Sequence, residues 1–182
     1  MDYDDIIRTR YSVRTYSQRP VEQEKRNKIL EAGRLAPTAG NRQTQRIVVV
    51  EGEEAMEKMK QCTPCHFDAP LLFLVCYDKS VENNNHYGDK RPYGQVDASI
   101  VLTYMMLEAH NLGLGTVWVG LFNPDLLRKS FCIPDHYEIL SLMPAGYPAA
   151  DAKPGNMHSE KYPVEHTVFY DSFEENVVSI EV

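Results

Sequence analysis

The feature that most constrains the fold is a helix expected from Asp97 to about Leu112 that is apolar on nearly every side. Asp97 suits its N-cap or first turn, and Gly113 suits the position that ends it. A helix without a polar face must be covered, either centrally in the domain or in a subunit interface. Its apolar residues are Ala98, Ile100, Val101, Leu102, Tyr104, Met105, Met106, Leu107 and Ala109.

The rest of the chain supplies short helices and strands in mixed order. The near-continuous apolar run Leu71 to Tyr77 is typical of a strand covered on both faces. We therefore expect one three-layer domain of the α+β or α/β class over residues 1–182, with a buried sheet of four or five strands. Residues 164–170 alternate like a last strand or an extended arm. The other expected helices are 2–9, 21–35, 53–61 and 124–131, and the other strands are 47–51, 116–119 and one within 137–146.

Composition narrows the classes of partner. The chain has 182 residues and a net charge of −7, which disfavours nucleic acid or an anionic membrane as a general partner. No apolar run approaches the ~20 residues that span a bilayer. The N-terminus is acidic and has no signal-peptide core, so we expect a cytoplasmic protein.

The cysteines include one pair with redox spacing, Cys62-Thr63-Pro64-Cys65, followed by His66. A thioredoxin-like pair should lie between a strand and a helix, whereas this pair follows a polar helix and precedes a strand. A zinc site would need two further ligands, and no second close pair exists. We interpret these thiols as incidental and expect no metal.

The segment Arg10-Tyr11-Ser12-Val13-Arg14 offers an anion two permanently charged guanidinium groups and a hydroxyl. Taken alone, it also fits a solvated basic turn. Three later segments strengthen the first interpretation. They are the amide-rich loop Pro37-Thr38-Ala39-Gly40-Asn41-Arg42-Gln43, the glycine-spaced Gly113-Leu114-Gly115-Thr116-Val117-Trp118-Val119-Gly120, and Gly146-Tyr147-Pro148 with Lys153 and Lys161 beyond it.

In this order and spacing, the four segments resemble the nitroreductase family of FMN-dependent oxidoreductases. The family's Arg-x-Ser-x-Arg/Lys opening corresponds to Arg10, Ser12 and Arg14, and its Pro-Ser/Thr-x-x-Asn-x-Gln corresponds to residues 37–43. Its helix end and Trp-Ile/Val-Gly strand correspond to residues 109–120. The resemblance covers roughly residues 3–170. It implies a three-layer fold, a mostly antiparallel sheet, and a homodimer with two FMN sites and an extended C-terminal arm.

The resemblance also implies roles for individual residues. Arg10 and Ser12, supported by Lys161, would hold the FMN phosphate, and Arg14 would reach the pyrimidine edge of the flavin. The backbone of Val119 and Gly120 would lie near flavin N5 and O4. The partner subunit would supply Thr38, Ala39, Asn41 and Gln43. The cofactor-binding set is Arg10, Tyr11, Ser12, Arg14, Pro37, Thr38, Ala39, Asn41, Gln43, Trp118, Val119, Gly120 and Lys161.

The implied reaction is ping-pong hydride transfer through N5, from NAD(P)H to nitroaromatics, quinones or related acceptors, with no catalytic side chain. Three alternatives remain open: a flavin-binding or storage protein with little turnover, a reductive dehalogenase of the same family, and a non-flavin redox protein using Cys62 and Cys65. Residues 83–94 fall where a lid over the flavin is expected. Thr44-Gln45 departs from the Pro-Trp that usually follows the amide-rich loop.

Overall fold

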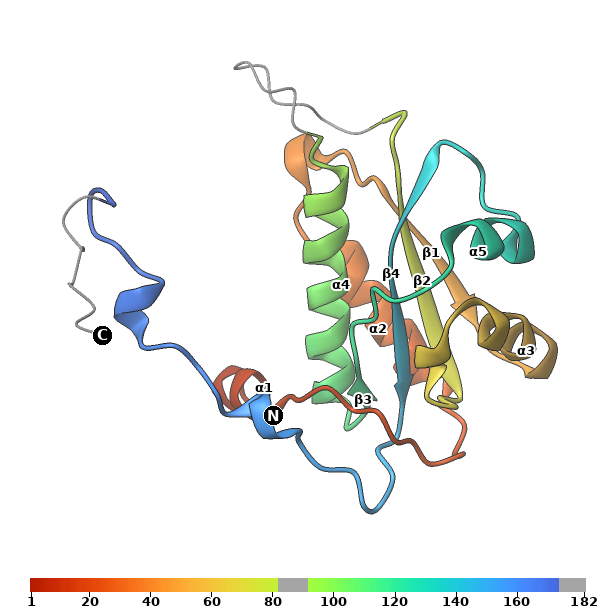
Figure 1. Cartoon of the computed structure of the whole chain (residues 1–182), viewed down its shortest axis with the longest axis horizontal. Coiled ribbons are helices and arrows are strands. Elements are labelled where there is room, and N and C mark those ends of the chain that lie inside the picture. The colour runs from red at the N-terminus through yellow and green to blue at the C-terminus, as the bar shows by residue number, and fades with distance from the viewer. Residues whose placement is uncertain (82–91, 174–182) are drawn as a thin grey trace.

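The computed structural model describes residues 1–81 and 92–173, and its centre is a four-stranded sheet. The strands are β1 (Gln45–Val50), β2 (Leu71–Asp78), β3 (Gly115–Thr116) and β4 (Tyr137–Gly146), and they lie in the order β1-β2-β4-β3 (Figure 1). Every neighbouring pair is antiparallel. The expected α+β class, antiparallel sheet and strand number are therefore confirmed.

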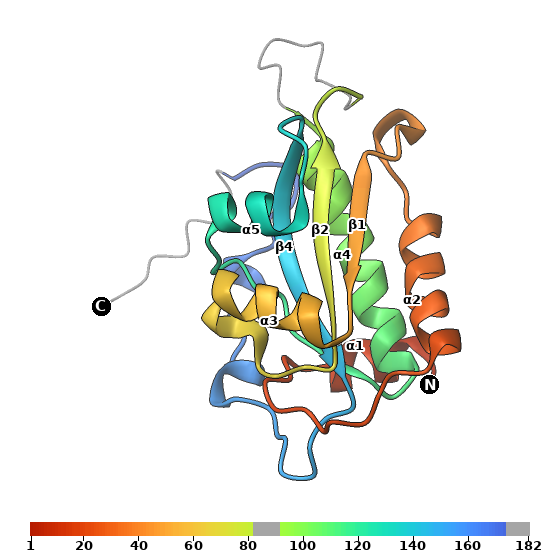
Figure 2. The same cartoon turned by 90° about the vertical axis from the view of Figure 1, so that its right-hand side faces the viewer.

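Helices cover both faces of the sheet (Figure 2), which confirms the three layers. On one face lie α2 (Gln23–Leu35) and α4 (Gly94–Asn111). On the other lie α3 (Glu53–Cys62) and α5 (Pro124–Phe131). The residues of β2 are all buried, as expected for a strand covered on both sides.

The long apolar helix is α4, and it begins before Asp97, at Gly94. Asp97 therefore occupies the first turn, one of the two places expected for it. At the other end, Gly113 has a φ of 78° and leads into Leu114, whose N–H donates to the Ala109 carbonyl at 2.8 Å. This left-handed glycine ends the helix as predicted and turns the chain into β3.

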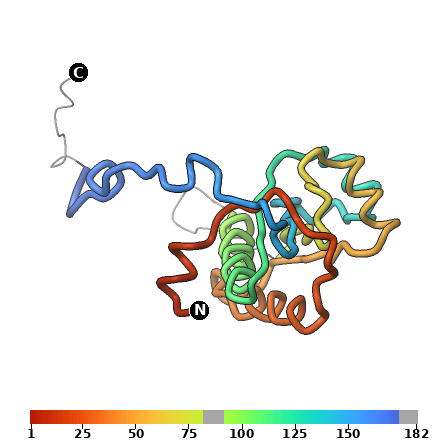
Figure 3. The backbone as a smooth tube through the Cα atoms, turned by 90° about the horizontal axis from the view of Figure 1, so that it is seen from below, coloured from red at the N-terminus to blue at the C-terminus, as the bar shows by residue number. Residues whose placement is uncertain are grey.

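One strand expectation needs correction, and one of the two alternatives for residues 164–170 is excluded. The sequence left a last strand or an extended arm open there, and these residues contain no strand; Val164–His166 is a single 3-10 turn. The alternating pattern has no neighbouring strand to pair with there, because the chain after β4 runs away from the sheet, past α1 (Tyr3–Thr9) (Figures 1 and 3). The strand expected at 116–119 is shorter, Gly115–Thr116, with an isolated bridge from Val119 to Leu142.

Within the described residues, no helix is long and apolar enough to cross a membrane. Of the expected lid, residues 83–91 lie outside the part of the chain that the structure describes, and residues 92–94 lead into the start of α4 at Gly94.

The N-terminal segment approaches β3 so closely that only glycine fits. A Cβ on Gly115 would lie 2.4 Å from Cγ2 and 2.7 Å from Cβ of Val13, a side chain that is itself buried. We expect Gly115→Ala to lower the free energy of unfolding by about 1–3 kcal/mol, because overpacking forces the two segments apart. Denaturant unfolding would measure the change.

Gly155→Ala provides the control for this experiment. Its added Cβ would meet nothing within 4 Å, so we expect a change within about 0.5 kcal/mol. A Gly115→Ala protein as stable as the wild type would contradict the close packing of Val13 on β3.

Candidate functional site

The arginine-serine motif lies in an extended segment along the edge strand β3. Helix α1 ends at Thr9, and Ser12 then forms a parallel bridge with Thr116. The Val13 N–H donates to the Thr116 carbonyl at 3.0 Å, and the Val13 side chain is buried. Because side chains alternate along an extended chain, Ser12 and Arg14 lie on the face opposite Val13. Burying valine thus turns the polar side chains of the motif outward.

The Gly146-Tyr147-Pro148 motif lies beside the same segment. Tyr16 and Pro148 form an antiparallel bridge, and the Ser17 N–H donates to the Tyr147 carbonyl at 2.9 Å. This pairing sends the chain after β4 back past the arginine-serine motif.

The consequence is a cationic cavity of about 540 Å³ between two distant parts of the sequence. From the N-terminal side it is lined by Arg10, Ser12 and Arg14, and from the C-terminal side by residues 155–158 and Lys161. The structure therefore brings together all three side chains expected at a phosphate, together with Arg14. We call this the cationic cavity below.

Sequence reasoning did not single out four residues of the cationic cavity: Gly155, Asn156, Met157 and His158. They form a 3-10 turn, Asn156–His158, just before Lys161. Pro and Gly at 154–155 are common turn residues, but nothing in the sequence relates this segment to the N-terminus. The His158 ring packs edge-on against Tyr11, with 6.2 Å between centroids.

Two titratable groups behind the arginine-serine motif are held neutral. Burial raises the pKa of Tyr16 well above its usual value, opposed by the charge of Arg14. Its hydroxyl therefore stays a donor, to the Val13 carbonyl at 2.7 Å. Burial, and then the charge of Arg10, lowers the pKa of His110, whose Nε2 lies 2.8 Å from Thr9 Oγ1. A neutral His110 adds no repulsion next to Arg10.

The amide-rich loop after α2 forms a compact turn. The Thr38 hydroxyl accepts a hydrogen bond from the Gln43 N–H at 3.0 Å, and the Asn41 N–H donates to the Thr38 carbonyl at 2.9 Å. Gly40, Asn41 and Gln43 all have left-handed φ, at 58°, 53° and 50°. Pro37, Asn41 and Gln43 are exposed, whereas Thr38 and Ala39 are partly buried.

The segment after β3 is tied to β4 by the backbone of Val119. Its N–H donates to Leu142 and its carbonyl accepts from Leu142, at 2.9 and 3.0 Å. The Val119 amide is therefore already bonded within the chain. Gly120 is exposed and offers its backbone, and Trp118 is 37% exposed.

Within one chain, the amide-rich loop and the cationic cavity lie at opposite ends of α4. Ala39 is bonded to Asp97 in the first turn of the helix, whereas Thr9, next to Arg10, contacts His110 in the last. At 1.5 Å per residue, positions 97 and 110 are about 20 Å apart along the helix axis. The structure therefore groups the expected site residues into two separate sets.

The cysteine pair lies at the end of α3 and in the turn that follows it. Cys62 is buried at the end of α3, its Sγ lies 3.2 Å from the Lys58 carbonyl, and burial raises its thiol pKa. Both Cys62 and Cys65 are free thiols. Across residues 1–81 and 92–173, no group of three or more histidine, cysteine or acidic side chains is placed to hold a metal.

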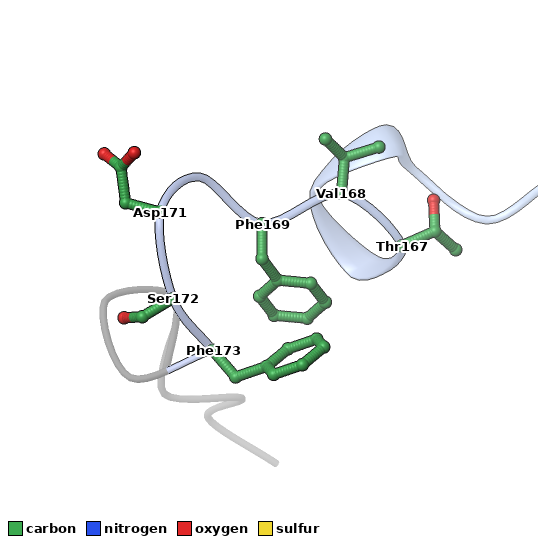
Figure 4. A pocket seen from close by; sticks show the side chains of 6 residues that line it. All are labelled: Thr167, Val168, Phe169, Asp171, Ser172 and Phe173. Atoms are coloured by element: carbon green, nitrogen blue, oxygen red, sulfur yellow. The ribbon is translucent and has the colours of Figure 1, made fainter. Parts of the chain in front are cut away.

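A further cavity of about 490 Å³ lies in the C-terminal segment (Figure 4). Its lining comes entirely from the short stretch 167–173, in which the Phe169 and Phe173 rings pack 5.0 Å apart. None of the expected site residues contributes to it.

The sequence matches the nitroreductase family over residues 7–63 and 63–147. These segments make up more than half of the chain, so the protein belongs to the nitroreductase family. The match includes the arginine-serine motif and the amide-rich loop, and it stops before Lys161.

Relatives agree with this assignment. The crystal structure of a nitroreductase family protein from Clostridium difficile 630 is 38% identical, with a TM-score of 0.88, and covers 94% of this chain and 99% of that one. A second Clostridium difficile structure, described as an FMN-dependent nitroreductase, is 28% identical, with a TM-score of 0.76 and coverages of 93% and 99%. The Bacillus subtilis FMN reductase (NAD(P)H) is 31% identical over 156 residues, which is 76% of this chain and 62% of that protein.

Proposed function

We propose that this protein is an FMN-dependent oxidoreductase that uses NAD(P)H to reduce nitroaromatics, quinones or related acceptors, as a cytoplasmic homodimer. The observation that carries the proposal is the cationic cavity, in which Arg10, Arg14 and Lys161 converge with the Ser12 hydroxyl. Family membership supports it, as do the names of the FMN reductase and the FMN-dependent nitroreductase among the relatives.

The cationic cavity suits a phosphate monoester. Arginine supplies forked charged donors, serine a neutral donor and lysine a point charge, and all three residue types line one cavity in a chain whose net charge is −7. The Lys161 Nζ donates to the His158 carbonyl, at 2.6 Å, on the border of this cavity. In this assignment Arg10, Ser12 and Lys161 hold the FMN phosphate. Arg14, which is exposed, reaches the pyrimidine edge of the flavin.

The amide-rich loop suits the flavin ring. Asn41 and Gln43 each carry a donor and an acceptor, as does the heterocycle. Because the loop lies at the far end of α4 from the cationic cavity, we place it on the partner subunit's FMN. Bound FMN would supply hydride transfer between NAD(P)H and the acceptor. In this assignment Gly120, which has no side chain, lets the flavin ring approach its backbone closely, and Trp118 borders the ring.

The exposed apolar side chains of α4 support the dimer. Val96, Ile100 and Tyr104 recur every four residues, so they lie on one face of the helix, and Val96 and Tyr104 are 50% and 42% exposed. The C-terminal segment adds exposed Tyr162 and Tyr170. Exposed apolar side chains of this kind are typical of an interface. A second copy of the chain would cover it and bring the two sets of site residues together.

The first test is the absorption spectrum of the purified protein, followed by anaerobic addition of NADH and then NADPH. We expect flavin bands that bleach with at least one of the two donors. Bands that neither donor bleaches would favour a flavin-binding protein with little turnover. A colourless protein that does not take up FMN would contradict the proposal and reopen a thiol mechanism through Cys62 and Cys65.

A second prediction concerns the phosphate. We expect Arg10→Ala to weaken FMN binding about tenfold or more, because a hydrogen bond to a charged group contributes about 1.5–3 kcal/mol. Riboflavin lacks the phosphate, so its affinity should be unchanged. Fluorescence titration with both flavins measures this, with Lys58→Ala on α3, outside the cationic cavity, as the control. An equal loss of affinity for both flavins would contradict the placement of Arg10 at the FMN phosphate.

A third prediction concerns assembly. We expect the double variant Val96→Glu, Tyr104→Glu to run at the 20.8 kDa mass of one chain in light scattering, whereas the wild type runs at twice that mass. Charges on both sides of an apolar interface repel each other and lose hydration. Val48→Glu, on the edge strand β1, introduces the same charge at a residue that is 38% exposed and should remain dimeric. A monomeric wild type that binds FMN would contradict the shared site.

A further inference from the structure

Asp97 links the first turn of α4 to the amide-rich loop. Its side chain is only 2% exposed, and its Oδ1 accepts a hydrogen bond from the Ala39 N–H at 2.8 Å. The two residues are 58 positions apart, so this contact joins the loop to the central helix rather than to its own neighbours. Ala39 is also one of the residues expected at the cofactor.

The loop that Asp97 holds has a backbone that needs support. Gly40 adopts its left-handed φ freely, but Asn41 and Gln43 hold φ of 53° and 50° with side chains attached. Non-glycine residues keep such conformations when the surrounding structure enforces them. Inside the loop, the Thr38–Gln43 bond fixes the shape of the turn, and Arg46 on β1 donates to the Gln43 carbonyl at 3.1 Å. Asp97 is what fixes the other side of the turn to α4.

The environment of the second carboxyl oxygen, Oδ2, indicates that Asp97 does more than stabilise the fold. Asp97 Oδ2 is buried and accepts no hydrogen bond from the part of the chain that the structure describes. A buried polar atom without a partner costs about 1–3 kcal/mol, so an apolar residue of similar size would satisfy packing at lower cost. An apolar residue, however, cannot accept the hydrogen bond from the Ala39 N–H.

We infer that Asp97 is a positioning residue that holds residues 38–43 in the conformation that reads the flavin of the partner subunit. The inference rests on the proposed function, because it takes the amide-rich loop to face FMN. Asp97 acts through the loop: its carboxyl group is covered by protein and contacts the Ala39 backbone.

The test compares Asp97→Leu with Asp97→Asn. Leucine has the same branched skeleton, with larger methyl groups in place of the two carboxyl oxygens, and cannot accept a hydrogen bond, whereas asparagine matches the size of aspartate and keeps an oxygen that can take the Ala39 N–H. Asp97→Ala gives the same comparison if leucine does not fit. Leu127→Ala, on the opposite face of the sheet, controls for general loss of core packing.

The first readout needs no cofactor. Arg42 is exposed within the loop, so the rate of tryptic cleavage after it reports how often the loop opens. We expect Asp97→Leu to raise that rate about fivefold or more, the change that loss of one ordinary hydrogen bond produces. Cleavage after Lys161 serves as the internal reference. Asp97→Asn should be cleaved at the wild-type rate.

The second readout is FMN affinity by fluorescence titration. We expect binding to weaken about fivefold or more in Asp97→Leu, and to stay within about threefold of wild type in Asp97→Asn and Leu127→Ala. Wild-type values for Asp97→Leu in both readouts, or equal losses in Asp97→Asn, would overturn the inference. Faster cleavage with unchanged FMN affinity would overturn the link between the loop and the flavin. A wild type that binds no FMN would instead overturn the proposed function.

Discussion

The packing of α4 against the sheet is the constraint on which the rest of the structure depends. Its residues Ala98, Val101, Leu102, Met105 and Ala109 lie fully buried in the larger of the two main cores, against β2, β4 and α2. Because the helix is rigid and central, each of its ends becomes a fixed point for a separate piece of the chain. The first turn carries the amide-rich loop through Asp97, and the last turn meets α1 through His110 and Thr9.

The left-handed turn at Gly113 extends this control to the cationic cavity. It delivers the chain into β3, and the glycine at 115 lets Val13 pack against that strand. The Ser12–Thr116 bridge then fixes the register of the arginine-serine motif. Pairing of Tyr16 with Pro148 returns the C-terminal segment to the same place, so that Lys161 joins Arg10. The cavity is thus assembled by three segments from the two ends of the chain and its middle.

The same helix separates the two sets of candidate site residues, which are the half-sites of the proposed homodimer. Its length separates the amide-rich loop from the cationic cavity, and its apolar side chains Val96 and Tyr104 are exposed to solvent. In the proposed homodimer the partner subunit covers the exposed apolar face of α4, and the same contact brings the half-sites of the two subunits together. Stability of the assembly and completeness of the flavin site would then have a common physical cause.

The sequence by itself determined the class of fold, the family and most helix and strand positions. Periodicity and glycine signals are local, which is why α4, its end at Gly113 and the buried strand β2 were predictable. Of the two alternatives for residues 164–170, a last strand or an extended arm, the strand was wrong, because alternation specifies a strand only when a partner strand is within reach. Only the tertiary structure decided that His158 and Asn156 line the cationic cavity, that the Val119 amide is already bonded to Leu142, and that Asp97 holds Ala39. These contacts join residues far apart in the chain, and no local pattern encodes the distance between them.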